Sequence, residues 1–422
     1  MNINTFRAFR SRNYRLYFAG QSISLIGTWM QRTAVYWIIY TQTHSALMLG
    51  LGVFAAQFPS FLFSPLGGVV SDKYNRYQVM IVTQIASLVQ AFLLVVVVMF
   101  TQYALWEIFA LSALLGTINA FDVPARQSMV NEIISHKEDL PNAIALNSSM
   151  VNIARLIGPA ISGIVLEKLG AGTCFLINAL SFIVVILCLL FMRLPKYIRQ
   201  QHSKKAMHEF KEGWKYLKRT PSISLVILLI ASISISVLPF TTLLPVFAKV
   251  IFKGNASTFG YLNSAIGLGA VGGTIFLASL KANVNLKKIL FINILILGAG
   301  LILFSHSTNL TVALIFAMLS GFGMMSQTTI SNTIIQTNVS QEMRGRVISY
   351  FAMAYFGMLP LGGLLIGIVS EYIGAPNTIL AEGTISIFIA IIFLPFLKKD
   401  ILKEKDKLTL IELEDPTATT NQ

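Results

Sequence analysis

The sequence predicts an all-helical (all-α) integral membrane protein with twelve transmembrane helices in two six-helix bundles. Three observations support this fold class. First, 55% of the 422 residues are hydrophobic and only 12% are charged, and the mean hydropathy is +0.70, which lies outside the range of soluble globular domains. Second, twelve apolar stretches approach or exceed the length of about 20 residues that crosses a hydrocarbon core. Third, the longest gap between these stretches, residues 194–222, follows the sixth of them.

The elements follow from the apolar stretches in chain order. The first stretch comes after an arginine-rich segment, residues 7–15, and it is longer than the apolar region of a signal peptide, so we expect it to be retained as the first span. The expected spans are 15–40, 46–71, 78–100, 104–125, 143–167, 172–193, 223–248, 258–280, 288–306, 310–336, 346–370 and 377–397. Residues 1–193 then form the N-terminal bundle and residues 223–397 the C-terminal bundle.

Two polar segments lie outside the bundles, a linker (194–222) and a tail (398–422). In the linker, Phe210, Trp214 and Leu217 recur at helical spacing among lysines. This pattern predicts an amphipathic helix on the inner membrane surface, with a solvated linker as the alternative. The tail is polar and charged, which predicts a disordered segment.

The distribution of lysine and arginine predicts the orientation. With the N-terminus in the cytoplasm, 27 of the 32 basic residues fall in cytoplasmic segments and three in outer loops, while Arg32 and Arg155 lie within spans. Cytoplasmic segments of membrane proteins carry such an excess. We therefore expect both termini, the linker and the tail to be cytoplasmic.

The two halves of the chain resemble each other. Residues 158–171, GPAISGIVLEKLGA, align without gaps on residues 362–375, GGLLIGIVSEYIGA, with seven identities in fourteen positions at an offset of 204. A Glu-x-x-Gly pair occurs in both segments, which apolar composition alone seldom produces. The alignment equates span 5 with span 11, as two parallel repeats of six helices require.

The stretch GGVVSDKYNRY, residues 67–77, places a compact group of charges between the second and third spans. Charges are costly inside a bilayer, so this group belongs at the membrane edge. The stretch resembles the loop between helices 2 and 3 of the major facilitator superfamily of secondary transporters, whose pattern is G-x-L-A-D-[RK]-x-G-R. Gly68, Asp72, Lys73 and Arg76 fit that pattern, and other residues stand at its three remaining fixed positions.

The resemblance implies the major facilitator fold, in which this loop acts as a gating latch. Carried over, Asp72 would face the positive end of a helix near residues 345–349, and Arg76 would pair with Asp122 in span 4. Such a latch would hold the halves together on the cytoplasmic side and release them when the cavity opens inward. The alternative is that these charges only set topology and cap helix ends.

A second group of residues resembles a narrower branch of the superfamily. Residues 122–133, 139–163 and 211–223 look like the branch of enterobactin exporters and related transmembrane secretion effectors. Gly158, Pro159 and Gly163 also resemble the G-P-x-x-G signature on helix 5 of drug antiporters, where such residues bend and thin the helix. The resemblance implies a hinge in helix 5, with plain close packing as the alternative.

Charged residues inside the spans are the candidates for a substrate cavity. Arg155 lies about 18 Å along span 5 at the helical rise, near the middle of the membrane, where an arginine needs a wet cavity or an acidic partner. Arg32, in span 1, and Glu382, in span 12, are candidates for the same cavity. Glu382 is also the acid best placed for proton coupling, because burial favours the protonated carboxyl. The alternative is that Glu382 lies at the water-exposed rim of the membrane span. Three other glutamates are expected at the outer edge: Glu107, Glu167 and Glu371.

Several function classes are disfavoured. The sequence has no nucleotide-binding P-loop, no HExxH, no Cys/His metal cluster and no GxSxG, and Cys174 and Cys188 lie in one expected helix. The basic residues are scattered through short gaps rather than gathered on one surface, which argues against nucleic acid. We therefore expect no enzyme, no cofactor and no metal, and an ion gradient, worth about 2.3 kcal/mol per charge per 100 mV, as the driving force.

With the resemblance, these features predict a monomeric transporter of the bacterial inner membrane. It would export a small amphipathic or anionic molecule, of siderophore or drug type, against protons by alternating access. The two arginines slightly favour an anion. The alternatives are a lipid or lysophospholipid flippase and a non-transporting membrane sensor or complex subunit.

Overall fold

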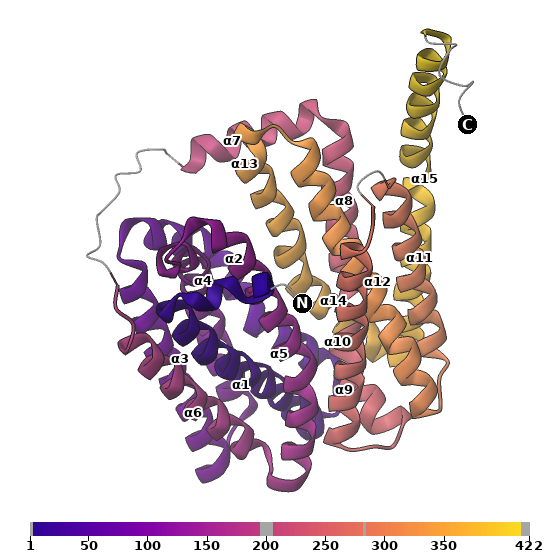
Figure 1. Ribbon diagram of the computed structural model, residues 1–422. Coiled ribbons are helices and arrows are strands. Elements are labelled where there is room, and N and C mark those ends of the chain that lie inside the picture. Colours follow the sequence, from indigo (N-terminus) through magenta and orange to yellow (C-terminus); the bar gives the residue numbers. More distant parts are fainter. Residues whose placement is uncertain (1–2, 195–205, 282–283, 415–422) are drawn as a thin grey trace.

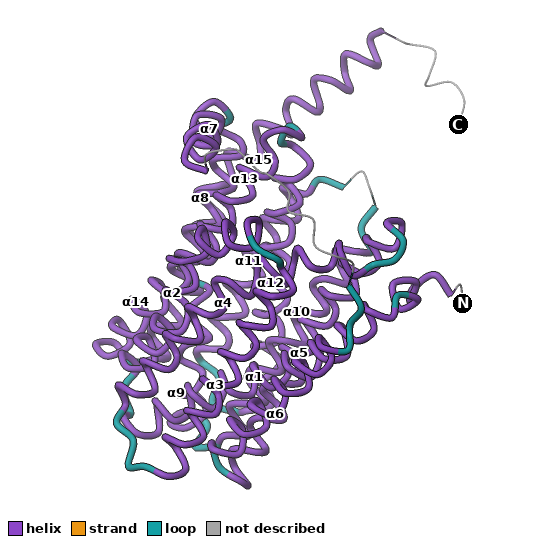
Figure 2. Tube along the Cα trace, turned by 90° about the vertical axis from the view of Figure 1, so that its left-hand side faces the viewer, coloured by secondary structure: helices purple, strands orange, loops and turns teal. Residues whose placement is uncertain are grey.

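The computed structural model describes residues 3–194, 206–281 and 284–414, which form helices joined by short connections (Figures 1 and 2). No strand occurs in these ranges, so the all-helical prediction is confirmed. In Figure 1 the helices of the first half, in indigo and purple, lie on the left, and those of the second half, in orange and yellow, lie on the right.

Six long helices form the first half. They are α1 (Arg12–Thr43), α2 (Ala46–Lys73), α3 (Arg76–Phe100), α4 (Leu105–Ile133), α5 (Leu140–Leu169) and α6 (Ala171–Leu190), with a short helix, η1 (Ile3–Arg10), before them and another, η2 (Lys137–Asp139), before α5. Ser11, Ser45 and Asn75 precede α1, α2 and α3, and each side chain accepts a hydrogen bond from a backbone N–H of the first turn. These caps satisfy donors that a helix leaves unpaired, and so fix where the helices start.

The second half contains more breaks. Its elements are α7 (Ala206–Arg219), α8 (Pro221–Ser236), η3 (Leu238–Leu243), α9 (Leu244–Val246), η4 (Phe247–Ile251), α10 (Ala256–Ala278), α11 (Leu286–Ser305), α12 (Leu310–Asn338), α13 (Gln341–Ala352), η5 (Met353–Gly357), α14 (Met358–Ile373) and α15 (Ala375–Glu414). The expected span 7 is interrupted after Ser236, where Pro239 and Pro245 supply no backbone N–H. The expected span 11 contains one wide turn, η5, between α13 and α14.

Eleven helical segments of the described residues are long and apolar enough to cross a membrane. Helix α1 is not among them because its 32 residues include Gln21, Gln31 and Arg32. It is nevertheless packed against α5 and α6, with both glutamines buried. Counting α1, the twelve expected spans are present, and their order is that of the sequence.

The structure agrees with the prediction for the linker and differs from the prediction for the tail. The helix expected in the linker forms as α7, and residues 195–205 lie outside the described residues. The tail, expected to be disordered from residue 398, continues α15 as a helix to Glu414, and 415–422 lie outside the described residues. Lysine, glutamate and leucine, which dominate 398–414, are strong helix formers, so the helix does not end where the apolar stretch ends.

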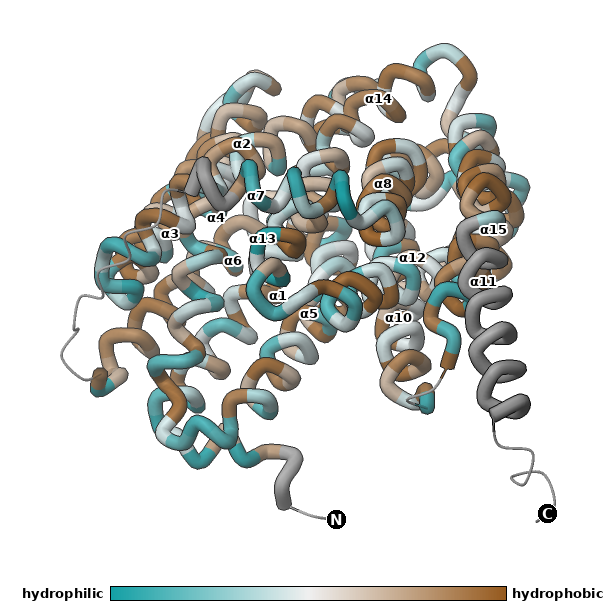
Figure 3. Tube along the Cα trace, turned by 90° about the horizontal axis from the view of Figure 1, so that it is seen from above, coloured by the Kyte–Doolittle hydropathy of each residue, from teal (hydrophilic) through white to brown (hydrophobic). Residues whose placement is uncertain are grey.

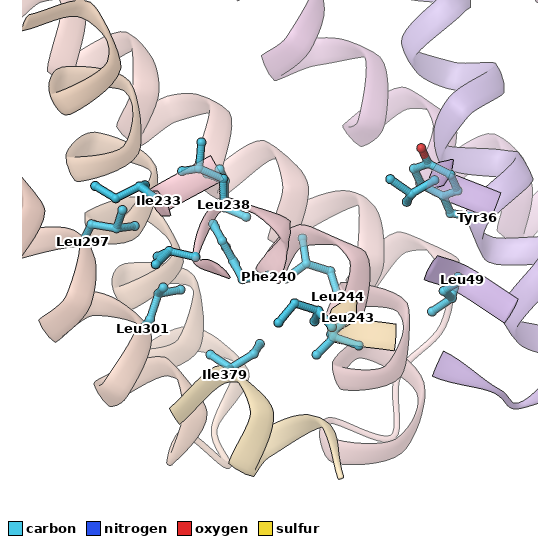
Figure 4. Close-up of a cluster of buried hydrophobic side chains, with 14 of the residues drawn as sticks. Tyr36, Leu49, Ile233, Leu238, Phe240, Leu243, Leu244, Leu297, Leu301 and Ile379 are labelled. Carbon is cyan, nitrogen blue, oxygen red and sulfur yellow. The ribbon is translucent and has the colours of Figure 1, made fainter. Parts of the chain in front are cut away.

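Each half packs mainly on itself. In the first half α2 lies against α4 and α1 against α6, and in the second half α12 lies against α10 and α11. A buried apolar core includes Ile233 of α8, Leu297 of α11 and Ile379 of α15 (Figure 4). Seen from above, the helices of the first half lie on the left, and α8, α10, α11, α12, α14 and α15 of the second half lie on the right (Figure 3).

The halves meet through two helix pairs, α5 with α10 and α2 with α14. We call the end of the bundles with the α2–α3 connection and α7 the basic end, and the end with the α1–α2 and α5–α6 connections the opposite end. Glycines bring the paired backbones close toward the opposite end: a Cβ on Gly367 would lie 2.7 Å from the Ala46 oxygen, and one on Gly163 would lie 2.8 Å from the Ala256 oxygen. Toward the basic end of α5, Ser148 and Ser149 are exposed. The structure is therefore closed at the opposite end.

Candidate functional site

A cavity with about 890 Å³ of empty space lies where the two halves meet. Its walls come from α1, α2 and α5 of the first half and from η3, α10, α12, η5 and α14 of the second. Its lining residues are Trp29, Arg32, Tyr36, Val53, Gln57, Arg155, Pro159, Leu238, Pro239, Thr241, Thr242, Asn263, Ile266, Gly267, Met324, Tyr355 and Leu359. The lining is thus mostly aromatic and aliphatic, with few polar groups and two cations, as is usual for a small-molecule site.

Two arginines from different helices meet at one tryptophan in this cavity. The guanidinium carbon of Arg32 lies 5.2 Å from the ring centroid of Trp29 and 5.6 Å from that of Tyr36. The guanidinium carbon of Arg155, on α5, lies 5.5 Å from the Trp29 centroid. These distances are within the range of a cation–π interaction. Spacings of three and four residues put Trp29, Arg32 and Tyr36 on one face of α1.

Neither arginine forms an ion pair with a carboxylate of the described residues. Arg155 Nε has no hydrogen-bond partner there, and its Nη1 lies 4.0 Å from the sulfur of Met325. Aromatic faces offset only part of the cost of removing a guanidinium from water. The cavity therefore carries positive charge that an anion would neutralise.

Glu382 does not line this cavity. It lies in α15 with 1% of its surface exposed, and neither carboxyl oxygen has a hydrogen-bond partner among the described residues. The helix is held there by close packing, because Gly383 contacts Gly298 and the Ser386 hydroxyl donates to the Ile294 carbonyl at 3.0 Å. The expectation that Glu382 shares a cavity with Arg32 is therefore wrong, since α15 presents it to the interior of the second half.

The internal repeat allows the surroundings of Glu382 to be compared with those of its counterpart in the first half. At the same offset of 204, its counterpart in the first half is Asn178 of α6. The amide of Asn178 donates to Gln31 at 2.7 Å, and Gln31 donates to Gln90 at 3.0 Å, so three helices share a satisfied polar network. In the second half Glu382 has no such partners among the described residues, and an ionised carboxylate without partners is costly to bury.

The predicted latch contacts are only partly present. Arg76 Nη1 lies 2.5 Å from Glu132 of α4, and Arg76 Nη2 lies 3.9 Å from Asp72. Asp122 is not the partner of Arg76: it accepts hydrogen bonds from Thr83 at 2.9 Å and Gln84 at 2.8 Å. Helix α4 continues to Ile133 rather than ending near 125. Glu132 therefore reaches the α2–α3 connection, and Asp122, ten residues earlier, lies about 15 Å deeper.

The other latch residues lie at the surface of the basic end. The Asp72 side chain is 60% exposed, and the Lys73 ammonium lies 5.8 Å from the Tyr74 ring. No atom of the described residues lies within 4 Å of a Cβ placed on Gly68, whereas one on Gly67 would lie 1.8 Å from the Ala120 oxygen. The close approach between α2 and α4 therefore requires Gly67. Asp72 facing residues 345–349 stays a prediction.

The glycines and the proline of helix 5 lie at contacts between helices. A Cβ on Gly158 would lie 2.5 Å from the Trp29 Cβ, and Gly163 lies against the Gly260 Cα. Pro159 lines the cavity, and α5 remains one continuous helix around it. Close packing is thus present, and a hinge at these residues stays a prediction.

Comparison with known proteins identifies the family. The model of the transmembrane secretion effector family matches residues 3–420. The chain belongs to this family, a branch of the major facilitator superfamily. It is 28% identical over 385 residues to the staphyloferrin A transporter of Staphylococcus aureus (90% of this chain, 95% of the relative). It is 22% identical over 390 residues to macrolide efflux protein A of Streptococcus pyogenes (90% and 96%).

Solved structures show the same fold. The nucleoside transporter NupG, in a mutant form, has a TM-score of 0.74 at 13% identity, covering 91% of this chain and 98% of that one. A POT family transporter in complex with 5-aminolevulinic acid has a TM-score of 0.71 at 13% identity, covering 92% and 96%. The prediction of the major facilitator fold is therefore confirmed.

The contacts of three glutamates in this transmembrane secretion effector were not predicted from sequence. Glu132 pairs with Arg76, although nothing in the sequence marks it apart from its place at the end of a helix. Glu167 and Glu371, expected only to lie at the outer edge, each hydrogen-bond to the other half of the molecule. Their shared Glu-x-x-Gly pattern at the repeat offset is the signal that could have found them.

Proposed function

We propose that this chain is a secondary active exporter that binds an organic anion at Arg32 and Arg155 and exchanges it for protons. Membership of the transmembrane secretion effector family supports membrane transport. The names of its relatives, a staphyloferrin A transporter and a macrolide efflux protein, support export of a siderophore-like or drug-like molecule.

The observation that carries the choice of substrate is that neither arginine has a carboxylate partner among the described residues. A cavity whose described lining holds two guanidiniums and no acid attracts anions and repels cations. The aromatic walls suit the apolar part of an amphipathic molecule, because they offer area for burial. We therefore favour an acidic siderophore-type substrate over a cationic drug.

Proton coupling is assigned to Glu382. A buried carboxyl without partners is more stable protonated than ionised, because the effective cost of burying a charge is several kcal/mol. If the second half rearranges so that water reaches α15, the proton can leave. The excess of basic residues at the basic end supports a cytoplasmic location for that end. The described conformation is then the inward-open one.

The test uses purified protein in liposomes with a pH-sensitive dye inside. Imposed gradients of staphyloferrin A and of erythromycin, a macrolide, serve as probes, and proton flux is recorded. We expect proton flux with the anionic siderophore. This flux should be lost in Arg155→Gln and partly kept in Arg155→Lys. Arg15→Gln is the matched control, because Arg15 is an exposed arginine at the basic end. Flux with erythromycin alone, or equal flux in Arg155→Gln, contradicts the anion assignment. Lipid movement without proton flux would instead indicate a flippase, and neither activity a sensor.

A further inference from the structure

Two glutamates at the opposite end connect the halves through helix N-termini. Glu371, in the last turn of α14, accepts a hydrogen bond from the Leu47 backbone N–H at 3.0 Å and another from the Ser45 hydroxyl, both at the start of α2. Glu167, in the last turn of α5, accepts a hydrogen bond from the hydroxyl of Ser257 at the start of α10. Each carboxylate therefore belongs to one half and its donors to the other.

The two contacts are related by the internal repeat. Glu167 and Glu371 are equivalent at the offset of 204, and each follows by four residues a glycine that lies against the same receiving helix. Gly163 lies against the first turns of α10 and Gly367 against those of α2. The neighbours of the two glycines have matching spacing: Ala256, Ser257 and Gly260 for one, and Ala46, Leu47 and Gly50 for the other. The same contact, a glycine followed four residues later by a glutamate at a helix N-terminus of the other half, thus occurs on both sides of the cavity.

The electrostatics of both contacts depend on helix ends. Among the described residues neither Glu167 nor Glu371 forms an ion pair with a basic side chain. Their carboxylates instead lie at helix N-termini, where unpaired N–H groups and the helix dipole favour negative charge. Such a contact is lost as soon as the receiving helix moves away, because the donors move with it.

We propose that Glu167 and Glu371 are paired gate residues that close the opposite end in this conformation. Opening that end separates α5 from α10 and α2 from α14, so both carboxylates must leave their helix N-termini. This inference rests on the alternating access of the function proposed above. It adds two residues at the end away from the latch, placed symmetrically about the cavity.

Glu107 provides a matched control. It also lies at the opposite end, and its carboxylate accepts a hydrogen bond from the Ala104 N–H at 3.0 Å. That contact caps its own helix, α4, and joins nothing across the halves. Loss of a local cap and loss of a gate can therefore be compared at the same end of one protein.

The experiment measures access to the cavity from outside. Gln57, which lines the cavity, is replaced by cysteine. The rate at which a membrane-impermeant maleimide labels this cysteine is measured in intact cells. The protein that keeps Gln57 shows how much labelling comes from Cys174 and Cys188. Removing a helix cap typically costs about 1 kcal/mol, which changes the ratio of the closed to the open conformation about fivefold. We therefore expect about fivefold faster labelling in Glu167→Ala and in Glu371→Ala, about 25-fold in the double variant if the effects add, and no change in Glu107→Ala.

A further variant tests the bond itself. Ser257→Ala should reproduce Glu167→Ala and add nothing to it, because both remove one interaction. Unchanged labelling in the double glutamate variant, at equal amounts in the membrane, overturns the proposal, as does an equal increase in Glu107→Ala. Labelling needs neither substrate nor a gradient. If the glutamate variants label faster as expected but the protein exports neither staphyloferrin A nor erythromycin, the gate is supported and the proposed export is rejected. If the protein exports normally but the glutamate variants label at the parent rate, only the gate is rejected.

Discussion

Replacing Gly367 by alanine should open the contact between the two halves without unfolding either. A Cβ there would lie 2.7 Å from the Ala46 carbonyl oxygen and 3.2 Å from the Cα atoms of Leu47 and Gly50, whereas ordinary contact begins at 3.4 Å. The backbones must therefore separate by about 0.7 Å at this point. Overpacking of this kind costs about 1–3 kcal/mol, which corresponds to roughly 5- to 150-fold in the ratio of two conformations. Because α14 and α2 belong to different halves, the strain can be relieved by moving the halves apart.

The assay is maleimide labelling of Gln57→Cys from outside, together with thermal stability in detergent. We expect faster labelling in Gly367→Ala and in its repeat equivalent Gly163→Ala, with little change in melting temperature. Gly68→Ala is the matched control, because in the described part of the chain no atom lies within 4 Å of its Cβ position. Gly321→Ala is the opposite control: its Cβ would lie 2.1 Å from the Ile266 oxygen within the second half, so we expect loss of folded protein.

Two results would refute this reasoning. If Gly367→Ala labels at the rate of the parent protein while remaining folded, the contact between α2 and α14 does not control access. If Gly68→Ala is as disruptive as Gly367→Ala, the packing at the motif glycine differs from that in the structure.

Three further predictions concern charged residues. Asp72→Asn should impair transport while membrane insertion, followed by immunoblot, stays normal; unimpaired flux would remove the latch. Asp122→Ala should lower stability by about 1–3 kcal/mol, because it leaves the buried amide of Gln84 without its acceptor and removes the carboxylate that lies 3.6 Å from Arg126, and a melting curve equal to that of the parent would contradict this. Glu382→Gln should abolish the pH dependence of transport while sparing substrate binding, and an unchanged pH profile would assign coupling to another group.

Much of the fold could be predicted because apolar length is a strong signal. Each apolar stretch corresponds to a helical segment, since a chain in lipid must satisfy its backbone internally. Details that depend on local backbone chemistry were harder to predict. The break after Ser236 lies within a continuous apolar run, where hydropathy does not distinguish a straight helix from a broken one. The helical tail was missed because a charged composition is typical both of disorder and of exposed helices.

The candidate site depends on helix rotation and helix length, which hydropathy determines poorly. The depth of Arg32 and Arg155 along their spans was enough to suggest a shared cavity, because an arginine at mid-membrane needs polar surroundings. Glu382 lies nearer the end of its helix, seven residues after Ala375, and that helix is apolar on most sides, so the sequence did not indicate which way the carboxyl points. Asp122 was paired with Arg76 because the inner end of α4 was placed eight residues too early.

The most direct test of the account is a pair of spin-label distances across the halves, one at each end, in the same membranes. Trp106→Cys with Tyr372→Cys reports on the opposite end, and Tyr74→Cys with Gly345→Cys on the basic end; all four positions are exposed. When pH and an anionic substrate are varied, the account predicts that one distance lengthens as the other shortens. Two distances that stay fixed, or that lengthen together, would contradict alternating access about the arginine-lined cavity.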